Sequence, residues 1–577
     1  MALRIRRDGR WVELSYQAVA DQVQDLSLGL LELGVAPGDR VAILSENRPE
    51  WAIADYACLA ACCTDVPIYP TLPARQAEYI LRDSGAVAVL VSSDAQLEKL
   101  QTVRANLPAL RHVIGLDALG EGVLRYADVL ARGRAARDRH PDWRARALRV
   151  GPDELATLIY TSGTTGDPKG VMLTHGNISS NVSTSVELFE FREDDECLSF
   201  LPLSHIFERM FGHYCMFSKG VLINYAGGIE SVPTDMQERR PTLMASVPRL
   251  YEKIYARVHD QVRASSAPRR RLFAWGKRVG EAWAERVVDR QPVPPGLALQ
   301  RRLADRLVFA RLRARTGGRI RFFISGGAPL SPDIARFFFA AGMPILEGYG
   351  LTETSPVMAV NTFEHLKLGT VGRPIPDVEI RIAPDGEILT RGPNVMRGYF
   401  NKPEATREAL DAEGWFRTGD IGVLDAEGFL RITDRKKDLI VTAGGKNIAP
   451  QPIENLAKTS KFVASAVMLG DRRPFPIMLV VPNAEAVRGW ARHKGLIADE
   501  SDLEAMLALA EVQQKVEREV RKTLRDLAQF EMPKRLLLLP RDFSVEGGEL
   551  TPTLKVRRRI VEQRHRAAIE ALYADHA

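Results

Sequence analysis

Short apolar runs alternate with amphipathic segments along the first 150 residues. Residues 16–33 carry apolar side chains at helical spacing and are followed by Gly34, which predicts a helix ending there. Residues 52–61 predict a second helix. Short apolar runs between helices are typical of parallel strands that are buried on both faces. The pattern therefore predicts an α/β fold with doubly wound sheets, whose strands include 40–44, 86–91, 155–160 and 320–324.

The pattern changes in two later regions. Residues 251–316 are rich in Arg and Ala, with apolar residues at helical spacing and prolines at 292, 294 and 295. Because the charges are of both signs, we expect a solvated helical hairpin, and a basic interaction patch is the alternative. Residues 370–434 contain many glycines, short β-prone runs and turn sequences, which predicts a β-rich subdomain.

A highly charged stretch, Asp434–Asp438, is followed at once by a predicted strand at 439–442. We interpret this stretch as a domain boundary. The prediction is a large N-terminal domain over 1–434, which includes the β-rich subdomain, and a small α+β C-terminal domain over 435–577. A length of 577 residues also exceeds what one hydrophobic core usually supports.

Composition narrows the function classes. Lys and Arg outnumber Asp and Glu by only 79 to 73, so the net charge of +6 does not indicate a nucleic-acid partner. The five cysteines show no metal-site or disulfide spacing, which favours reduced thiols in a cytoplasmic protein. We expect no secretory signal and no membrane span. Peripheral membrane contact and oligomerisation both stay open.

A loop rich in hydroxyl groups and glycine follows the predicted strand at 155–160. Its sequence, Thr161-Ser162-Gly163-Thr164-Thr165-Gly166-Asp167-Pro168-Lys169-Gly170, combines hydroxyl donors, a lysine and glycines that allow backbone N–H groups to approach an anion. The loop lacks the Lys-Ser/Thr pair of a Walker A motif. It predicts a phosphate site, and a polar turn is the alternative.

Six further segments occur in a fixed order after this loop. They are Pro202–Arg209, Ser325–Leu330, Gly348–Thr354, Thr418–Asp420, Asp434–Asp438 and Leu550–Lys555. With the loop, they resemble the adenylate-forming superfamily, which includes acyl-CoA synthetases, luciferase and adenylation domains. The resemblance covers nearly the whole chain. It implies ATP, Mg²⁺ and coenzyme A as cofactors, and a small mobile C-terminal domain that swings about the hinge.

The resemblance also implies roles for individual residues. Lys555 and His205 are the expected catalytic residues together with Glu353, which with Thr352 offers oxygen ligands suited to Mg²⁺. We expect Lys555 on an exposed loop from which it reaches the site, where its charge would bring two anionic groups together. The expected nucleotide and coenzyme A contacts are Thr161, Ser162, Gly163, Thr164, Thr165, Gly166 and Lys169 at the phosphates, Gly326, Gly327, Ala328, Gly348, Tyr349 and Gly350 at adenine, Asp420 and Arg435 at ribose, Lys437 at the hinge, and Gly444 and Gly445 beside pantetheine.

The substrate class rests on two segments, Ser246–Ile254 and Pro202–Arg209, which resemble long-chain fatty acyl-CoA synthetases in particular. The implied reaction makes an acyl-adenylate and then an acyl-CoA from a fatty acid. The alternatives are a fatty acyl-AMP ligase that delivers to a carrier protein and a CoA ligase for medium-chain or aryl acids. A non-catalytic protein that binds acyl chains or nucleotide is the alternative from another class.

Overall fold

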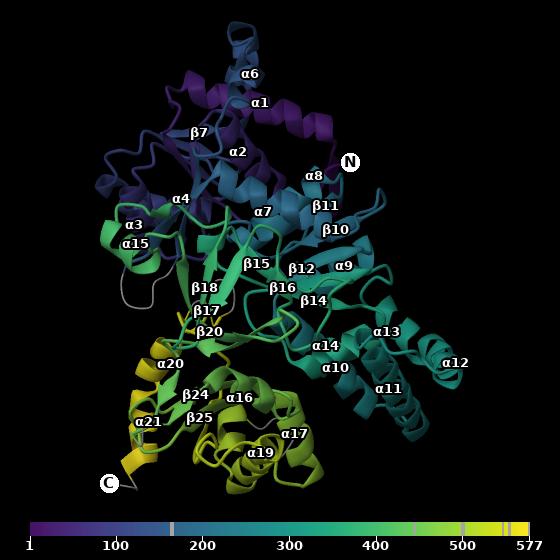
Figure 1. The fold of residues 1–577 in the computed structure, drawn as a ribbon. Coiled ribbons are helices and arrows are strands. Elements are labelled where there is room, and N and C mark those ends of the chain that lie inside the picture. Colours follow the sequence, from purple (N-terminus) through teal and green to yellow (C-terminus); the bar gives the residue numbers. More distant parts are fainter. Residues whose placement is uncertain (162–166, 444–445, 498–501, 545–546, 552–554, 575–577) are drawn as a thin grey trace.

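The computed structural model describes residues 1–161, 167–443, 446–497, 502–544, 547–551 and 555–574. It has a large N-terminal part and a smaller C-terminal part, which lies beneath the rest in the view of Figure 1. The predicted residues Ser162, Gly163, Thr164, Thr165, Gly166, Gly444 and Gly445 lie outside the described residues.

The first sheet of the N-terminal part has eight strands in the order β19-β9-β8-β4-β3-β5-β6-β7. Its centre is parallel, and β8–β9 and β9–β19 pair antiparallel. The strands are β3 (Arg40–Leu44), β4 (Thr64–Ile68), β5 (Ala88–Val91), β6 (His112–Gly115), β7 (Val123–Arg125), β8 (Leu155–Thr161), β9 (Lys169–Thr174) and β19 (Gly398–Tyr399). Helix α1 (Tyr16–Glu32) precedes these strands, and the helices between them are α2 (Pro49–Ala60), α3 (Ala74–Ser84), α4 (Asp94–Val103), α5 (Tyr126–Ala136) and α6 (Trp143–Ala147).

The second sheet has nine strands in the order β16-β15-β14-β13-β12-β10-β11-β1-β2. The strands are β1 (Leu3–Arg7), β2 (Arg10–Leu14), β10 (Glu196–Ser199), β11 (Leu222–Tyr225), β12 (Leu243–Ser246), β13 (Phe322–Ser325), β14 (Ile345–Gly350), β15 (Val357–Val360) and β16 (Arg373–Pro374). One hydrophobic cluster contains Val41 and Ile43 of the first sheet and Leu243 and Phe322 of the second, so the two sheets share a core. Helix α7 (His175–Leu188) precedes β10, the π-helix η3 (Glu208–Cys215) and α8 (Met216–Ser218) lie between β10 and β11, and α9 (Val232–Arg239) lies between β11 and β12.

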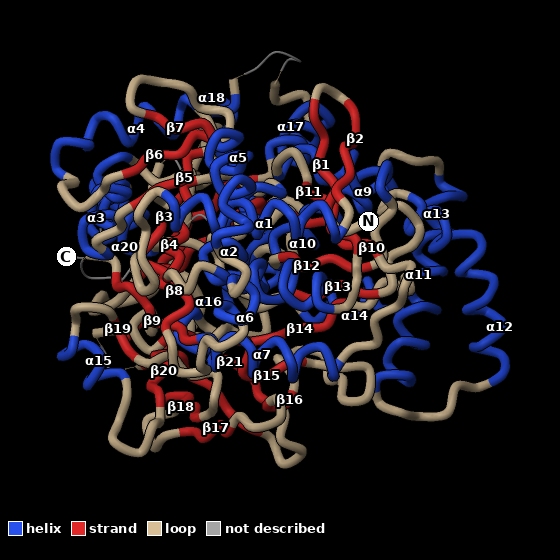
Figure 2. Tube along the Cα trace, turned by 90° about the horizontal axis from the view of Figure 1, so that it is seen from above, coloured by secondary structure: helices blue, strands red, loops and turns tan. Residues whose placement is uncertain are grey.

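The Arg-rich region forms more helices than the predicted hairpin. It contains α10 (Pro248–Arg263), α11 (Ala267–Val288), α12 (Pro295–Ala304), the π-helix η5 (Asp305–Phe309) and α13 (Ala310–Ala314). Because α12, η5 and α13 run on without a break, they form one arm of a hairpin with α11, and α10 precedes it. Prolines at the first turns of α10, α11 and α12 favour helix initiation there. Figures 1 and 2 both place α12 at the periphery of the molecule.

The β-rich subdomain is an antiparallel sheet in the order β17-β18-β20-β21, made of β17 (Glu379–Ile382), β18 (Glu387–Arg391), β20 (Phe416–Leu424) and β21 (Leu430–Arg435). Helix α15 (Pro403–Ala409) precedes β20. The charged segment that we interpret as a boundary lies where β21 ends. A short pair, β22 (Ile440–Val441) and β23 (Asn447–Ile448), follows it.

The C-terminal part has its own hydrophobic clusters around a three-stranded sheet, β24 (Val463–Leu469), β25 (Ile477–Pro482) and β26 (Arg535–Leu538). Its helices are α16 (Pro450–Ala457), α17 (Ala484–His493), α18 (Leu503–Leu507), α19 (Ala510–Thr523), α20 (Arg558–Arg564) and α21 (Arg566–Ala574). The predicted α/β fold with a β-rich subdomain and a separate C-terminal α+β domain is confirmed. No helix among the described residues has the length and apolarity to cross a bilayer.

A fully buried ion-pair cluster joins the first sheet to η3. The Arg209 guanidinium contacts the carboxylates of Asp55 on α2 at 2.5 Å and Asp65 on β4 at 2.6 Å, and all three side chains are completely buried. Nη1 of Arg209 also donates to Thr157 Oγ1 on β8 at 2.9 Å, and Tyr214 Oη donates to Asp55 Oδ2 at 2.7 Å. Because every partner comes from a different element or from η3 itself, the cluster fixes where η3 sits on the sheet.

Replacing Arg209 with Met should destabilise the fold, because it leaves two buried carboxylates without a countercharge. We expect the free energy of unfolding to fall by about 3–5 kcal/mol, measured by denaturant titration of the tryptophan fluorescence. The control is Arg407→Met, which removes an exposed ion pair with Glu404 and should change stability by roughly 1 kcal/mol or less. Equal effects of the two variants would contradict the structural role given to Arg209.

Candidate active site

The predicted site residues meet around one cavity of about 1130 Å³. It is bordered by strands β14, β20 and β21, by the residues before η3, and by the C-terminal segment that carries Lys555. Ala328 is exposed and is not among the lining residues. The other described candidates all line the cavity: Thr161, Lys169, His205, Gly326, Gly327, Gly348, Tyr349, Gly350, Thr352, Glu353, Asp420, Arg435, Lys437 and Lys555.

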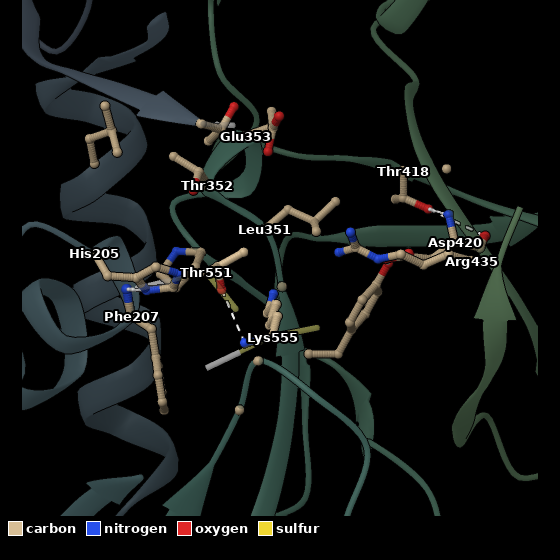
Figure 3. Close-up of a pocket in the computed structure, with 18 of the residues that line it drawn as sticks. His205, Phe207, Leu351, Thr352, Glu353, Thr418, Asp420, Arg435, Thr551 and Lys555 are labelled. Carbon is tan, nitrogen blue, oxygen red and sulfur yellow. Dashed lines mark hydrogen bonds and ion pairs between the residues drawn. The ribbon is translucent and has the colours of Figure 1, made fainter. Parts of the chain in front are cut away.

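Tyr349 of β14, Asp420 of β20 and Arg435 at the end of β21 form a polar group that joins two sheets, and Figure 3 labels Asp420 and Arg435. Tyr349 Oη donates to Asp420 Oδ2 at 2.7 Å, and Nε of Arg435 lies 3.3 Å from Asp420 Oδ1. Burial and the neighbouring Asp420 raise the pKa of Tyr349, so its hydroxyl stays protonated and can donate. A carboxylate has about four lone-pair sites, so Asp420 retains acceptor capacity for a ligand hydroxyl.

Glu353 lies in a second polar group that includes a residue the sequence did not indicate. Tyr399 Oη donates to Glu353 Oε1 at 2.9 Å, and the Lys169 ammonium lies 4.8 Å from the centroid of the Tyr399 ring. Tyr399 thereby links the start of β9, just after the hydroxyl-rich loop, to the Thr352–Glu353 pair. The aromatic pair Tyr399-Phe400 after Gly398 is the only sequence feature that marks it.

His205 is neutral in this structure. Burial, assisted by the positive charge of Lys555, lowers its pKa to about 3. Its Nδ1 lies 3.2 Å from the backbone N of Phe207. Because a backbone N–H only donates, Nδ1 accepts this hydrogen bond, and the proton of the neutral ring is on Nε2. His205 is then a hydrogen-bond donor through Nε2, rather than a cation, at the border of the cavity.

Lys555 was expected on an exposed loop, but the structure holds it half-buried at the centre of the site (Figure 3). Its backbone N–H donates to Thr551 Oγ1 at 3.0 Å, and Thr551 N–H donates to its carbonyl oxygen at 2.8 Å. Burial, and then the charge of Arg435, lowers the pKa of Lys555 to about 8, while Asp420 and Glu353 oppose the shift. The Lys555 ammonium therefore interacts electrostatically with both polar groups, the one around Asp420 and the one around Glu353.

Apolar side chains line part of the same cavity. Phe207 immediately precedes η3, Phe211 lies on η3, Phe189 follows α7, and Val360 ends β15. Ser185 of α7 also lines the cavity. The sequence gives no reason to place Phe189 or Val360 beside Phe207 and Phe211, because those positions are joined only by the packing of distant strands and helices.

Two ion pairs connect α10 to the C-terminal part. Arg249 Nη2 lies 2.5 Å from Asp542 Oδ2, and Lys458 Nζ lies 3.1 Å from Glu252 Oε1. Arg249 and Glu252 are one turn apart on α10, so both pairs act at one place. They stabilise the orientation of the C-terminal part in which Lys555 enters the cavity.

This arrangement defines a nucleotide-binding enzyme fold, and comparisons with known proteins agree. Residues 2–400 match the family described as AMP-binding enzyme, and residues 437–577 match its C-terminal domain. The chain belongs to the AMP-binding enzyme family. The anthranilate CoA ligase AuaEII, solved with anthranoyl-AMP, superposes with a TM-score of 0.74 at 18% identity, covering 99% of this chain and 95% of that one. At this identity, the similarity shows that the two proteins share a fold.

Curated relatives are similar over nearly their whole length. The long-chain-fatty-acid–CoA ligase FadD15 of Mycobacterium tuberculosis is 38% identical, covering 98% of this chain and 93% of that protein. The peroxisomal long chain acyl-CoA synthetase 7 of Arabidopsis thaliana is 34% identical over 100% of this chain and 84% of its own length. The long-chain-fatty-acid–CoA ligase 1 of Homo sapiens is 33% identical over 97% and 82%.

The lowered pKa of Lys555 predicts unusual reactivity. Its ammonium should lose its proton near pH 8 rather than near the ordinary 10.5, so an amine-acylating reagent should label it at pH 8 faster than the exposed Lys494. Arg435→Gln removes a repelling charge and should move the midpoint of labelling to higher pH. Mass spectrometry of tryptic peptides measures both rates. Labelling of Lys555 and Lys494 with the same pH dependence would contradict the electrostatic environment described.

Proposed function

We propose that this protein is an AMP-forming long-chain fatty acid–CoA ligase. The observation that carries the proposal is one cavity lined by charged side chains and also by aromatic and aliphatic ones, in a chain that is 38% identical to a long-chain fatty acid–CoA ligase over 98% of its length. A fatty acid needs both kinds of lining, because it has a carboxylate at one end of an apolar chain. His205 and Lys555 both line this cavity.

In the first half-reaction, the fatty carboxylate attacks the α-phosphate of ATP, the bond to the β-phosphate breaks, and pyrophosphate leaves. The ammonium of Lys555 brings the two anions together and offsets the charge that develops at phosphorus. Nε2–H of His205 donates to the carboxylate and orients it. Tyr349 lies against adenine between Gly348 and Gly350, with Gly326 and Gly327 nearby, while Asp420 accepts from the ribose hydroxyls beside Arg435.

In the second half-reaction, the thiol of coenzyme A attacks the acyl carbonyl and AMP leaves. We propose that the C-terminal domain, taken as 435–577, swings about Lys437 between the two steps. That movement withdraws Lys555 and brings the segment around 444–445 to the site for pantetheine. The ion pairs of α10 favour the first orientation, and their partly exposed setting keeps them weak enough to break.

Magnesium fits the site only as a companion of ATP. The described residues contain no group of three or more His, Cys, Asp or Glu side chains that could hold a metal. Glu353 presents a carboxylate whose Oε1 is already hydrogen-bonded to Tyr399, with the Thr352 hydroxyl adjacent in sequence. Mg²⁺ is commonly held by one or two carboxylates together with substrate phosphates and water, and there it would neutralise phosphate charge.

The compartment and the source of the fatty acid are part of the same proposal. The five cysteines are free, which supports a reducing, cytoplasmic environment. Long-chain acids partition into bilayers, so we propose peripheral membrane contact during substrate uptake.

The proposal is tested with purified protein, ATP, Mg²⁺ and fatty acids of graded chain length, with and without coenzyme A. We expect long-chain acyl-CoA and AMP only when coenzyme A is present, identified by mass spectrometry. Acyl-AMP that accumulates equally in both conditions would instead indicate an acyl-AMP ligase. Turnover confined to medium-chain or aryl acids would indicate another CoA ligase, and binding without turnover would indicate a non-catalytic protein.

Lys555→Ala separates catalysis from binding. Adenylation should fall by at least about a hundredfold, since removing a group that stabilises transition-state charge costs roughly 2.7–4 kcal/mol. ATP affinity, measured by calorimetry, should change little. Full adenylation by this variant would remove Lys555 from the mechanism.

The α10 ion pairs should matter for the first half-reaction alone. Arg249→Asp should slow pyrophosphate release roughly two- to fivefold, as expected for a partly exposed pair, and leave thioester formation from supplied acyl-AMP unchanged. Adding Asp542→Arg should restore the rate by reversing the pair. Equal slowing of both half-reactions, or no recovery in the double variant, would show that these residues do not select the orientation.

A further inference from the structure

Leucines that face outward form a stripe along α12 and η5. Leu299, Leu303 and Leu307 recur every four residues, and their exposed fractions are 61%, 49% and 42%. The opposite face of the same helical arm is already buried: Ala304, Val308, Phe309 and Leu312 pack in the cluster that includes Phe337 and Phe338 of α14 (Pro332–Ala340). The leucine stripe is therefore a second apolar face, and no described residue covers it enough to bury it.

The packing of α11 explains why the stripe points away from the protein. A Cβ built on Gly276 would lie 2.8 Å from Val308, and one on Gly280 would lie 2.5 Å from Phe309. These glycines allow α11 to approach η5 closely, so the face of η5 that carries Val308 and Phe309 is buried against α11. Leu303 and Leu307 are left exposed, and the labelled helix α12 of the same helical arm lies at the edge of the molecule in both overall views (Figures 1 and 2).

Positive charge is concentrated in the same region. Residues 248–316 contain 17 Lys and Arg against 6 Asp and Glu, which leaves 62 against 67 for the rest of the chain out of totals of 79 and 73. The region is thus strongly basic, while the remainder is slightly acidic. Arg302 and Arg306 are exposed and each precedes a stripe leucine by one position, and Arg311 follows Leu307 by four.

We infer that this surface, defined by Leu299, Leu303 and Leu307 with the flanking Arg302, Arg306 and Arg311, docks on an anionic lipid bilayer. An exposed apolar stripe between arginines is the arrangement by which helices lie in a bilayer interface, with leucines in the acyl boundary and guanidinium groups at lipid phosphates. A second protein copy would bring two such basic surfaces together, which is electrostatically unfavourable. The inference specifies the surface for the membrane contact proposed above.

Vesicle co-sedimentation of the full-length protein tests this directly and does not depend on catalysis. Wild-type protein should bind anionic vesicles made of phosphatidylcholine and phosphatidylglycerol. It should bind vesicles made of phosphatidylcholine alone at least tenfold more weakly. The double variant Leu303→Asp/Leu307→Asp should bind the anionic vesicles at least tenfold more weakly than wild type. The double variant Arg302→Gln/Arg306→Gln should also bind the anionic vesicles more weakly than wild type. The difference between this variant and wild type should become smaller at high salt, which screens the attraction of the arginines to the lipid.

The matched control is Leu119→Asp/Leu148→Asp, which changes two leucines that are 61% and 76% exposed elsewhere on the N-terminal part. It should bind as wild type. Turnover of a fatty acid dissolved without vesicles should be unchanged in the stripe variant, which shows that the fold is intact. Absence of vesicle binding by wild type, equal loss in the control, or a change of oligomeric state in place of vesicle binding would each overturn the inference. A protein that binds vesicles but makes no acyl-CoA would refute the proposed function alone.

Discussion

The position of the residues proposed to bind the fatty acid depends on the buried contact between Arg209 and two aspartates. A guanidinium without access to water requires full pairing, and Asp55, Asp65, Thr157 and Tyr214 provide it from α2, β4, β8 and η3. The backbone N–H of Arg209 in turn donates to the carbonyl oxygen of His205 at 3.1 Å. The cluster therefore fixes the turn that presents His205 and Phe207 to the cavity. π-Helices such as η3 occur frequently at functional sites. Here the π-helix carries Arg209, whose ion pairs hold this turn in place.

The polar end of the cavity is built differently, from segments that are far apart in the chain. Tyr349 of the second sheet and Asp420 and Arg435 of the β-rich subdomain are held together by a hydrogen bond and an ion pair. Lys555 comes from the other side, with the C-terminal part. The N-terminal side of the site is therefore held by its own contacts. Lys555 stays in the site only while the C-terminal part keeps its weak, partly exposed ion pairs with α10. That difference suits an enzyme whose two half-reactions need different groups at one place.

Much of this organisation followed from local sequence. The strand at 40–44 has the predicted limits, and 155–160 is one residue longer, because a run of buried apolar residues determines a central parallel strand. Of the predicted site residues that the structure describes, all but Ala328 line one cavity, since short loops at strand ends have little freedom. Tyr399 was missed because its contact with Glu353 joins residues 46 positions apart, and because no local pattern encodes the pairing of its strand, β19, with β9. The exposure of the α12 leucines could not be predicted from the sequence either, because helical spacing alone does not say which of two apolar faces is buried.

The central claim is that the fatty carboxylate itself attacks the α-phosphate of ATP. Turnover of a fatty acid whose carboxylate carries heavy oxygen tests it most directly, with the nucleotide product analysed by mass spectrometry. Attack at the α-phosphate predicts AMP that has gained a single heavy oxygen from the acid, together with unlabelled pyrophosphate. Unlabelled AMP, or ADP with labelled phosphate, would contradict the account.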